Sequence, residues 1–519
     1  MDQDRFAHLF TSNIMLSSFE LESVRHEIEA RTTTIRQLEF QIDVLKAERE
    51  KYQTLLSPLR RNLLPPEILG EIFTFSVSNS RPFSWDHQLN TLCLVCSAWR
   101  AAALIHPILW ATLGWYYIYS PQNFDVGKVK AWLLRSGKVK KTLHVMGRHE
   151  PDDSLLCPLS PHDLGKLFVD GPPLDTLSLA CTHAECLEAI FGDMQCGPAK
   201  KPSCASIHSL TLGMERASAE SFGRVCSILH RIPTVRTLSL ALPEIHEYFI
   251  YDRELPKPLP FGNLSGLTLV CDWPISLVLD ILRNCANLET LTLETEGCTR
   301  GYDPAFPRDI PILVLPRLRT LQLKEVVLSS KDTDILRYLR LPSLHTLDIT
   351  FYTMDRDEPD DYNLTNTGSD IASLVTGGSN RATNLQHLRL ESLSITSQGL
   401  YFILSALPTL THLTLERLES DSRLFRDAHT FSTKFLPQLK TLKIHEPSEL
   451  FTFNYSDVYN FLRRRKEGLT EESPDCLEEA GLTVSKAHST YPWKIALDDR
   501  HYHASEMAKK GIRLSIAAV

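Results

Sequence analysis

The sequence predicts an α/β protein in which a long helix and a small helical module precede an array of short parallel strands. Three observations support this prediction. Residues 1–57 contain neither Gly nor Pro, residues 63–113 are rich in large apolar side chains, and a six-residue apolar pattern recurs from residue 174 onward. A chain of 519 residues has room for such an array together with small modules.

The composition is that of a folded globular protein, with 43% hydrophobic and 23% charged residues. The net charge of −8 argues against nucleic acid as a partner, because phosphate contacts require a basic surface. No run approaches the roughly 20 apolar residues of a membrane span, and polar residues follow Met1 where a signal peptide would be apolar. The 12 cysteines lack disulfide-like spacing. We therefore expect free thiols, a cytoplasmic and/or nuclear setting, and no membrane partner.

Residues 1–59 are predicted to form a long helix and a coiled coil, because apolar residues recur every seven positions. The a positions of this heptad are Ile14, Leu21, Ile28, Ile35, Ile42, Arg49 and Leu56, and the d positions are Ser17, Val24, Arg31, Leu38, Leu45, Tyr52 and Leu59. Ile at a with Leu at d favours a parallel dimer, so we expect residues 14–56 to form a homodimer. The alternative is an amphipathic helix that folds back on its own domain.

Residues 60–113 are predicted to form three short helices. Pro65 and Pro66 stand at the start of the first, where a missing N–H costs little. A polar loop, 78–87, separates this helix from the second. The segment carries more large apolar side chains than a bundle of this size can cover, which indicates a docking face.

This segment resembles an F-box, through Leu64-Pro-Pro-Glu-Ile-Leu69, then Leu94-Val-Cys-Ser-Ala-Trp-Arg100, then Leu109-Trp110. With the coiled coil before it and the repeats behind it, the layout is similar to the expanded fungal group of F-box proteins. The resemblance implies docking to the Skp-type adaptor and, through it, to the cullin of a ubiquitin ligase. It implies that Trp99 and Trp110 hold the module together. The adaptor-binding residues that it implies are Leu64, Pro65, Pro66, Ile68, Leu69, Ile72, Phe73, Leu94, Val95, Cys96, Trp99, Leu109 and Trp110.

The pattern [LIV]-x-x-L-x-[LI] marks ten short strands behind this module. Its copies are Leu174–Leu179, Ile207–Leu212, Val235–Leu240, Leu264–Leu269, Leu288–Leu293, Leu318–Leu323, Leu344–Ile349, Leu385–Leu390, Leu410–Leu415 and Leu439–Ile444. Such recurrence is typical of leucine-rich repeats, which stack into a solenoid because no repeat can bury its Leu face alone.

We therefore predict an irregular horseshoe of about ten to twelve leucine-rich repeats over 174–485. Residues 114–173 are expected to be a linker and N-terminal cap with a degenerate first strand at 143–145. A last strand is expected at 482–484, and 486–519 are expected to form a tail or cap.

Side chains between the leucines are expected to line the concave face and to bind a protein substrate. Early repeats offer small uncharged residues such as Thr211 and Ser239. Later repeats offer the predicted substrate-binding residues Glu294, Lys324, Asp348, His387, Arg389, Glu391, His412, Glu416, Lys443 and His445. We expect charge reversal of Arg389 and Lys443 to abolish capture without loss of stability. The alternative is that these charges are the ordinary solvated face of a sheet.

Nothing in the sequence predicts catalysis, a cofactor or a metal. Cys93 and Cys96 form a C-x-x-C pair, but no second pair or His lies at ligand spacing, and a structural zinc needs four ligands. The familiar phosphate-binding and nucleophile motifs are missing. The sequence therefore predicts a non-catalytic substrate-recognition subunit, with a non-ligase coiled-coil and repeat scaffold as the alternative.

Overall fold

The computed structural model divides the chain into two compact units. The first comprises Met1–Ser80 and His87–Leu109, and the second comprises Arg81–Asp86 and Trp110–Val519. The structure describes residues 15–55, 64–78, 85–118, 125–147, 161–192, 206–216, 219–242, 259–271, 273, 275–294, 311–326, 334–351, 371, 384–428, 435–446, 453–467, 476–484 and 500–518. The predicted seam residues Ile14, Leu56 and Leu59 lie outside these ranges.

The first unit is helical. It contains α2 (Ser18–Leu55), α3 (Pro66–Ser78), α4 (Trp85–Val95), most of which belongs to this unit, and α5 (Ser97–Ile105). Cys96 separates α4 from α5 because its backbone is extended and its Sγ accepts the N–H of Trp99 at 3.5 Å, as an N-cap does. Among the described residues, no helix is both long and apolar enough to cross a membrane.

The second unit is built on one parallel sheet, to which the described residues contribute fourteen strands. The strands follow one another in chain order. They are β1 (Thr112–Ile118), β2 (Thr142–Gly147), β3 (Thr176–His183), β4 (Ser209–Arg216), β5 (Thr237–Ala241), β6 (Gly266–Val270), β7 (Thr290–Glu294), β9 (Thr320–Val326), β11 (Thr346–Phe351), β12 (His387–Glu391), β13 (His412–Glu416), β14 (Thr441–His445), β15 (Glu479–Val484) and β16 (Arg513–Ala518).

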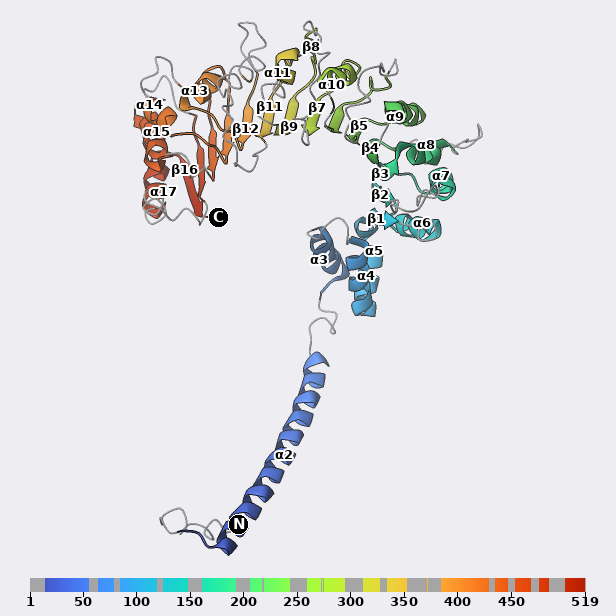
Figure 1. The fold of residues 1–519 in the computed structure, drawn as a ribbon, viewed down its shortest axis with the longest axis vertical. Coiled ribbons are helices and arrows are strands. Elements are labelled where there is room, and N and C mark those ends of the chain that lie inside the picture. Colours follow the sequence, from blue (N-terminus) through green and yellow to red (C-terminus); the bar gives the residue numbers. More distant parts are fainter. Residues whose placement is uncertain are drawn as a thin grey trace. The chain divides into compact units, whose positions relative to one another are not determined.

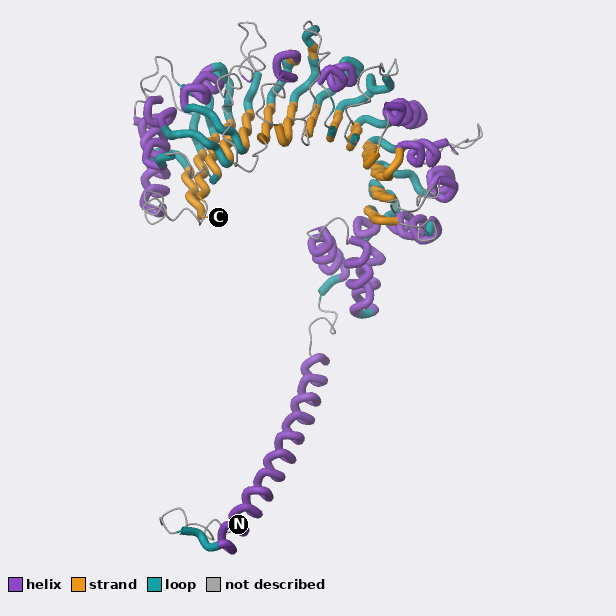
Figure 2. Tube along the Cα trace, viewed as in Figure 1, coloured by secondary structure: helices purple, strands orange, loops and turns teal. Residues whose placement is uncertain are grey.

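Helices and turns return the chain from the end of one strand to the start of the next. Within this unit the strands line the inner side of the curve and the helices lie on the outer side (Figures 1 and 2). The short helix η2 (Pro107–Trp110) precedes β1 in the chain and spans the boundary between the units. The return elements are α6 (Val126–Arg135), α7 (Pro161–Asp170), α8 (Ala184–Gly192), α9 (Ala219–Arg231), α10 (Ile275–Leu282), β8 (Leu313–Val314), α11 (Asp334–Tyr338), β10 (Leu339–Arg340), α13 (Ser397–Ser405), α14 (Arg423–Asp427), α15 (Tyr455–Glu467) and α17 (Arg500–Lys509).

The core of this unit consists of the leucines of the six-residue pattern. Burial alternates along the strands, as in β6 and β13, where the second and fourth residues are buried and the others are partly exposed. Each fully buried Leu contributes about 1.5–3 kcal/mol. Neighbouring strands pair in register, so Leu388 lies beside Leu413 and Leu413 beside Leu442. The core is therefore a stack of leucine rows that runs along the sheet.

The predicted α/β class, the long N-terminal helix and the single large parallel sheet are confirmed. The sheet has more strands than the predicted ten to twelve, because it extends at both ends. β2 contains the degenerate strand predicted at 143–145, and β15 contains the last strand predicted at 482–484. β1 and β16, which pair with β2 and β15, were not predicted. The boundary between the units falls at Leu109/Trp110, earlier than the predicted module boundary at residue 113.

Candidate functional sites

The helix α3 carries two apolar stripes, and only one of them is buried. Leu69, Phe73 and Val77 form the buried stripe, and Phe73 is 1% exposed. Residues at the other stripe, Ile68, Ile72 and Phe75, repeat at helical spacing on a different side and remain exposed. A helix that is apolar on several sides is normally covered on all of them. The bare stripe is therefore a candidate binding surface.

Bare apolar side chains also occur where α4 and α5 end. Leu94 is 75% exposed, and Val95, Leu104, Ile105 and Ile108 are exposed as well. Phe75, Leu104, Ile105 and Ile108 were not among the predicted adaptor-binding residues. Phe75 could have been found from its spacing, three residues after Ile72.

The inside of the module fixes how α3 and α5 pack. The rings of Phe73 and Trp99 lie 5.0 Å apart, so Trp99 joins the helices as predicted. Gly70 lies against His106, and a Cβ built on Gly70 would come within 2.5 Å of the His106 Nδ1 atom. Glycine is therefore required at the closest approach of α3 to the segment that follows α5.

Four of the predicted adaptor-binding residues are not accessible. Leu69, Phe73, Leu109 and Trp110 are buried, so the prediction that they present apolar area to a partner is wrong. The physical reason for Leu69 and Phe73 is that they occupy the inner stripe of α3. Of the remaining predicted residues, Pro65, Pro66, Ile68, Ile72, Leu94 and Val95 are exposed, and Leu64, Cys96 and Trp99 are half-buried.

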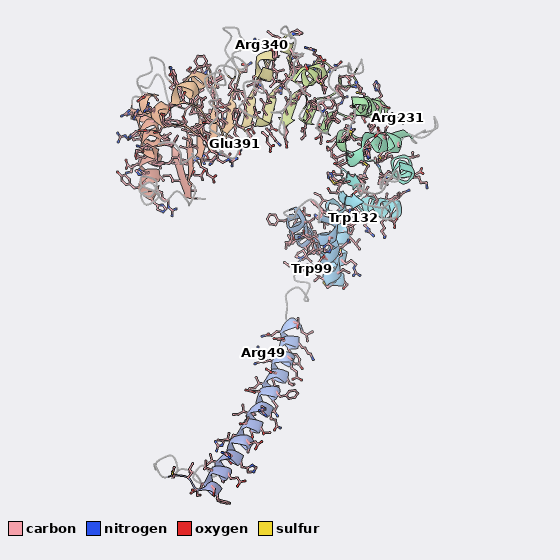
Figure 3. The ribbon with its side chains drawn as sticks, in the orientation of Figure 1. Arg49, Trp99, Trp132, Arg231, Arg340 and Glu391 are labelled. Atoms are coloured by element: carbon pink, nitrogen blue, oxygen red, sulfur yellow. The ribbon has the colours of Figure 1, made fainter. Side chains whose placement is uncertain are left out.

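Trp110 belongs to the second unit and supports the first strands of the sheet. Its ring meets that of Trp132 at 4.6 Å in an edge-on arrangement, and the Arg135 guanidinium lies 4.6 Å above it. Trp132, labelled in Figure 3, donates its Nε1–H to the Thr112 carbonyl at 3.3 Å. The expectation that Trp110 holds the three-helix module together is therefore wrong.

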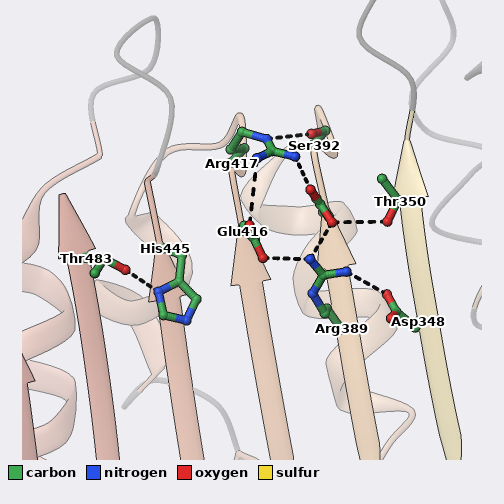
Figure 4. Close-up of polar contacts among 9 residues, drawn as sticks. Asp348, Thr350, Arg389, Ser392, Glu416, Arg417, His445 and Thr483 are labelled. Atoms are coloured by element: carbon green, nitrogen blue, oxygen red, sulfur yellow. Dashed lines mark hydrogen bonds and ion pairs between the residues drawn. The ribbon is translucent and has the colours of Figure 1, made fainter. Parts of the chain in front are cut away.

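The second candidate site is an ion cluster on the sheet face, centred on Arg389 of β12 (Figure 4). Arg389 contacts Asp348 of β11 at 3.1 Å, Glu416 of β13 at 2.8 Å and its strand neighbour Glu391. Desolvation opposes the charge on Arg389, but the hydrogen bonds that it donates to Glu416 and Asp348, with the charges of Asp348 and Glu391, outweigh desolvation and raise the pKa of Arg389. The guanidinium is therefore held between three carboxylates.

A second arginine closes this cluster from the ends of the strands. Arg417 pairs with Glu391, approaches Glu416 at 3.7 Å and donates its Nε–H to Ser392 Oγ at 3.2 Å. Arg417 and Ser392 both have left-handed backbones, with φ of 47° and 56°. This conformation is unfavourable for residues other than Gly. The contacts that Arg417 makes with Glu391, Glu416 and Ser392 offset the cost of this backbone conformation, which directs the chain out of the sheet.

Glu391 is the best-covered member of the cluster, only 8% exposed although it lies at a face position. The Thr350 hydroxyl also donates a hydrogen bond to Glu391 Oε2 at 3.1 Å. The prediction that Glu391 is open to a substrate is therefore wrong. Charge reversal of Arg389 would place four carboxylates together, so we now expect it to lower stability, in contrast to the expectation from the sequence. Sequence alone gave the residues of the face but not their mutual pairing.

The three predicted histidines lie near the cluster on β12, β13 and β14. The rings of His387 and His412 stack at 4.2 Å, and His445 Nδ1 hydrogen-bonds Thr483 Oγ1. Desolvation, followed by the charges of His387, Lys440 and Lys443, lowers the pKa of His412. His412 is therefore poorly suited to carry a positive charge.

The remaining predicted face residues are Glu294, Lys324 and Lys443. Lys324 pairs with Glu294 at 3.4 Å across β7 and β9. Lys443 is half-buried and lies beside Gly481, where a Cβ would meet its Cγ at 3.5 Å. Within the described part of the chain, no three His, Cys, Asp or Glu residues are grouped so as to hold a metal ion.

Comparison with known proteins adds little to these observations. No family model matches the chain, and no curated protein matches it. A solved Bacteroides fragilis protein is 14% identical, with a TM-score of 0.30 over 51% of this chain and 65% of that one. TLR13, solved in a complex with ssRNA13, is 12% identical, with a TM-score of 0.28 over 74% of this chain and 55% of that one. The chain thus spans less than two thirds of either protein, and these TM-scores are too low to carry an argument.

Proposed function

We propose that this chain is the substrate-recognition subunit of a cullin–RING ubiquitin ligase of the Skp–cullin–F-box type. In this proposal the α3–α5 module is an F-box of the expanded fungal type that docks to a Skp-type adaptor. The parallel sheet with its return segments is an irregular horseshoe of leucine-rich repeats whose strand face holds a protein substrate. The chain accelerates ubiquitin transfer by raising effective concentration, with no bond-making chemistry of its own.

The observation that supports the docking role is the bare stripe of α3 together with the bare end of α4. Ile68, Ile72 and Leu94 belong to the residue pattern that resembles an F-box, and all three are exposed. A module this small gains stability by burying such side chains. Their exposure is expected if a partner covers them.

Leu94→Asp tests this role, with Leu134→Asp on α6 as its matched control. Both positions are exposed helical leucines, 75% and 57% exposed, so neither change should alter the melting of the purified chain. Placing a carboxylate in an apolar interface leaves it buried without a partner. We expect Leu94→Asp to weaken capture of a purified Skp-type adaptor at least about tenfold, the equivalent of about 1.4 kcal/mol, while Leu134→Asp binds as the unsubstituted chain does.

Equal capture by the Leu94→Asp chain would show that this end of α4 is not the docking surface. Failure of the unsubstituted chain to bind any Skp-type adaptor would instead favour a non-ligase scaffold. In that case the three-helix module would serve packing, and the sheet face would hold a partner without ubiquitin transfer.

A further inference from the structure

The helix α2 presents an apolar seam that nothing in the described chain covers. None of its 38 residues is buried. Ile28 is 60% exposed, and six more large apolar residues of the a and d positions are exposed too, namely Leu21, Ile35, Leu38, Ile42, Leu45 and Tyr52, while Val24 is half-buried. Figure 3 draws the side chains of α2 as sticks along the helix, with Arg49 labelled near its C-terminal end. Most of the stability of a helix in a protein comes from packing its apolar face, so this seam indicates a partner.

The charges beside the seam discriminate between the two ways of pairing α2 with a second copy. In a parallel in-register pair, each g residue meets the e residue five positions later on the other helix. Glu20 then meets Arg25, an attractive pair. The other described pairs contain no like charges, and they are Glu27 with Thr32, Thr34 with Glu39, Gln41 with Lys46, and Glu48 with Gln53.

The antiparallel arrangement that best preserves the apolar seam brings like charges together. It sets Ile35 against Leu38 and Ile28 against Leu45 of the other copy. The same alignment sets Glu27 against Glu48 and Arg25 against Lys46, and symmetry repeats each contact. Like charges at flanking positions are destabilising, so these contacts disfavour the antiparallel pair.

We propose that α2 forms a parallel, in-register, two-stranded coiled coil with a second copy of this chain. A helix of 38 residues is about 57 Å long and about 10 Å wide, so the seam would cover about 570 Å² on each copy. The total of about 1,100 Å² exceeds the roughly 1,000 Å² that a specific interface needs. Within α2, Ile at three a positions with Leu at two d positions also favours two strands.

Two arginines in the seam set the register of this pair. Arg31 turns toward the flank, where its Nε lies 3.0 Å from Glu27 Oε1. Arg49 at an a position faces its own counterpart when the pair is parallel and in register, which weakens the dimer. In the antiparallel alignment it would face Val24 instead. The residue that Arg49 faces therefore distinguishes the parallel pair from the antiparallel pair. This proposal does not rest on the ligase function.

Mixing the full-length chain with its Arg49→Glu variant tests the proposal by native mass spectrometry, with a mass tag on one of the two. Parallel pairing sets Arg49 against the substituted carboxylate only in the heterodimer. We expect the ratio of heterodimer to either homodimer to rise from the random value of about 2 to at least about 10. Arg36→Glu, at an outward b position, is the matched control and should leave the ratio random.

A chain that is a monomer by light scattering at micromolar concentration would overturn the proposal, in favour of a seam covered by its own chain or by a different protein. A dimer that mixes at random with Arg49→Glu would overturn the parallel register. A trimer would overturn the two-stranded assembly. Adaptor capture is not read in this experiment, so its outcome is separate from that of the ligase proposal.

Discussion

The two candidate binding surfaces of this protein differ in how their side chains are satisfied. On the α3–α5 module, large apolar residues such as Phe75 and Leu94 stand in solvent with nothing over them. On the late part of the sheet face, Arg389 is enclosed by carboxylates from three strands. The apolar side chains of the first surface are exposed to solvent, whereas the charged side chains of the second surface are already paired with one another.

This difference changes what each surface is expected to do when it is altered. Removing a bare side chain changes binding and leaves the fold in place. Removing a member of a paired cluster leaves its partners uncompensated and lowers stability. The proposed role of the charged residues in substrate binding therefore cannot be tested by changing Arg389, and it is better tested at Lys443, which lies beside the cluster.

The largest expected effect is a difference in stability between alanine variants of two phenylalanines of α3. Phe73→Ala removes a 1% exposed ring from the inner stripe of α3, next to Trp99. It should cost about 3–5 kcal/mol and expose the α3 amides to hydrogen exchange. Phe75→Ala removes a 71% exposed ring and should change stability by less than about 0.5 kcal/mol. Similar loss of protection in both variants would mean that α3 does not have one buried and one bare stripe.

The sequence could not tell these two stripes apart. Apolar residues surround most of α3, and periodicity alone does not say which stripe meets α5. The choice depends on Gly70, whose missing side chain lets His106 approach. For this reason Leu69 was predicted to face a partner and is buried, whereas Phe75 was overlooked and is bare.

The strands were more predictable because each internal strand has its own leucines. The ends of the sheet follow a weaker pattern. In β15 the central Leu is replaced by Ala480, and the apolar residue that precedes β16 is Ile512, one position late for the six-residue pattern. These strands are held by pairing with a neighbour, as Ala480 lies beside both Leu442 and Leu514. Such support from neighbouring strands is not visible in a local pattern.

A second comparison concerns the ion cluster and should give an intermediate effect. Arg389→Met leaves the buried Glu391 with one cation and Asp348 with none from this cluster. Breaking a buried pair costs several kcal/mol, and since Arg389 is 35% exposed we expect about 2–3 kcal/mol by chemical denaturation. Lys443→Met, with its stem on Gly481, should cost less than about 1 kcal/mol. Equal stability of the two variants would show that the cluster is only a solvated surface.

The smallest expected effect is a pH dependence that arises beside the same cluster. Desolvation and then the positive charges of His387, Lys440 and Lys443 lower the pKa of His412 below its usual 6.5, with Glu479 opposing. Below pH 6.5 the unfolded chain therefore binds more protons than the folded one, and stability falls as the pH drops through this window. The loss should be small because His412 stays partly exposed and its charge is screened.

His412→Gln should flatten this dependence, measured as the denaturation midpoint between pH 7.5 and 5.5, a window chosen to cross the usual histidine pKa of about 6.5. Lys443→Met should flatten it in part, because it removes one of the charges that repel a protonated His412. A His412→Gln chain that keeps the full dependence would assign it to another histidine. His144 of β2 is the first to test, since burial lowers its pKa as well. It lies at the opposite end of the sheet, and its effect would be independent of Lys443.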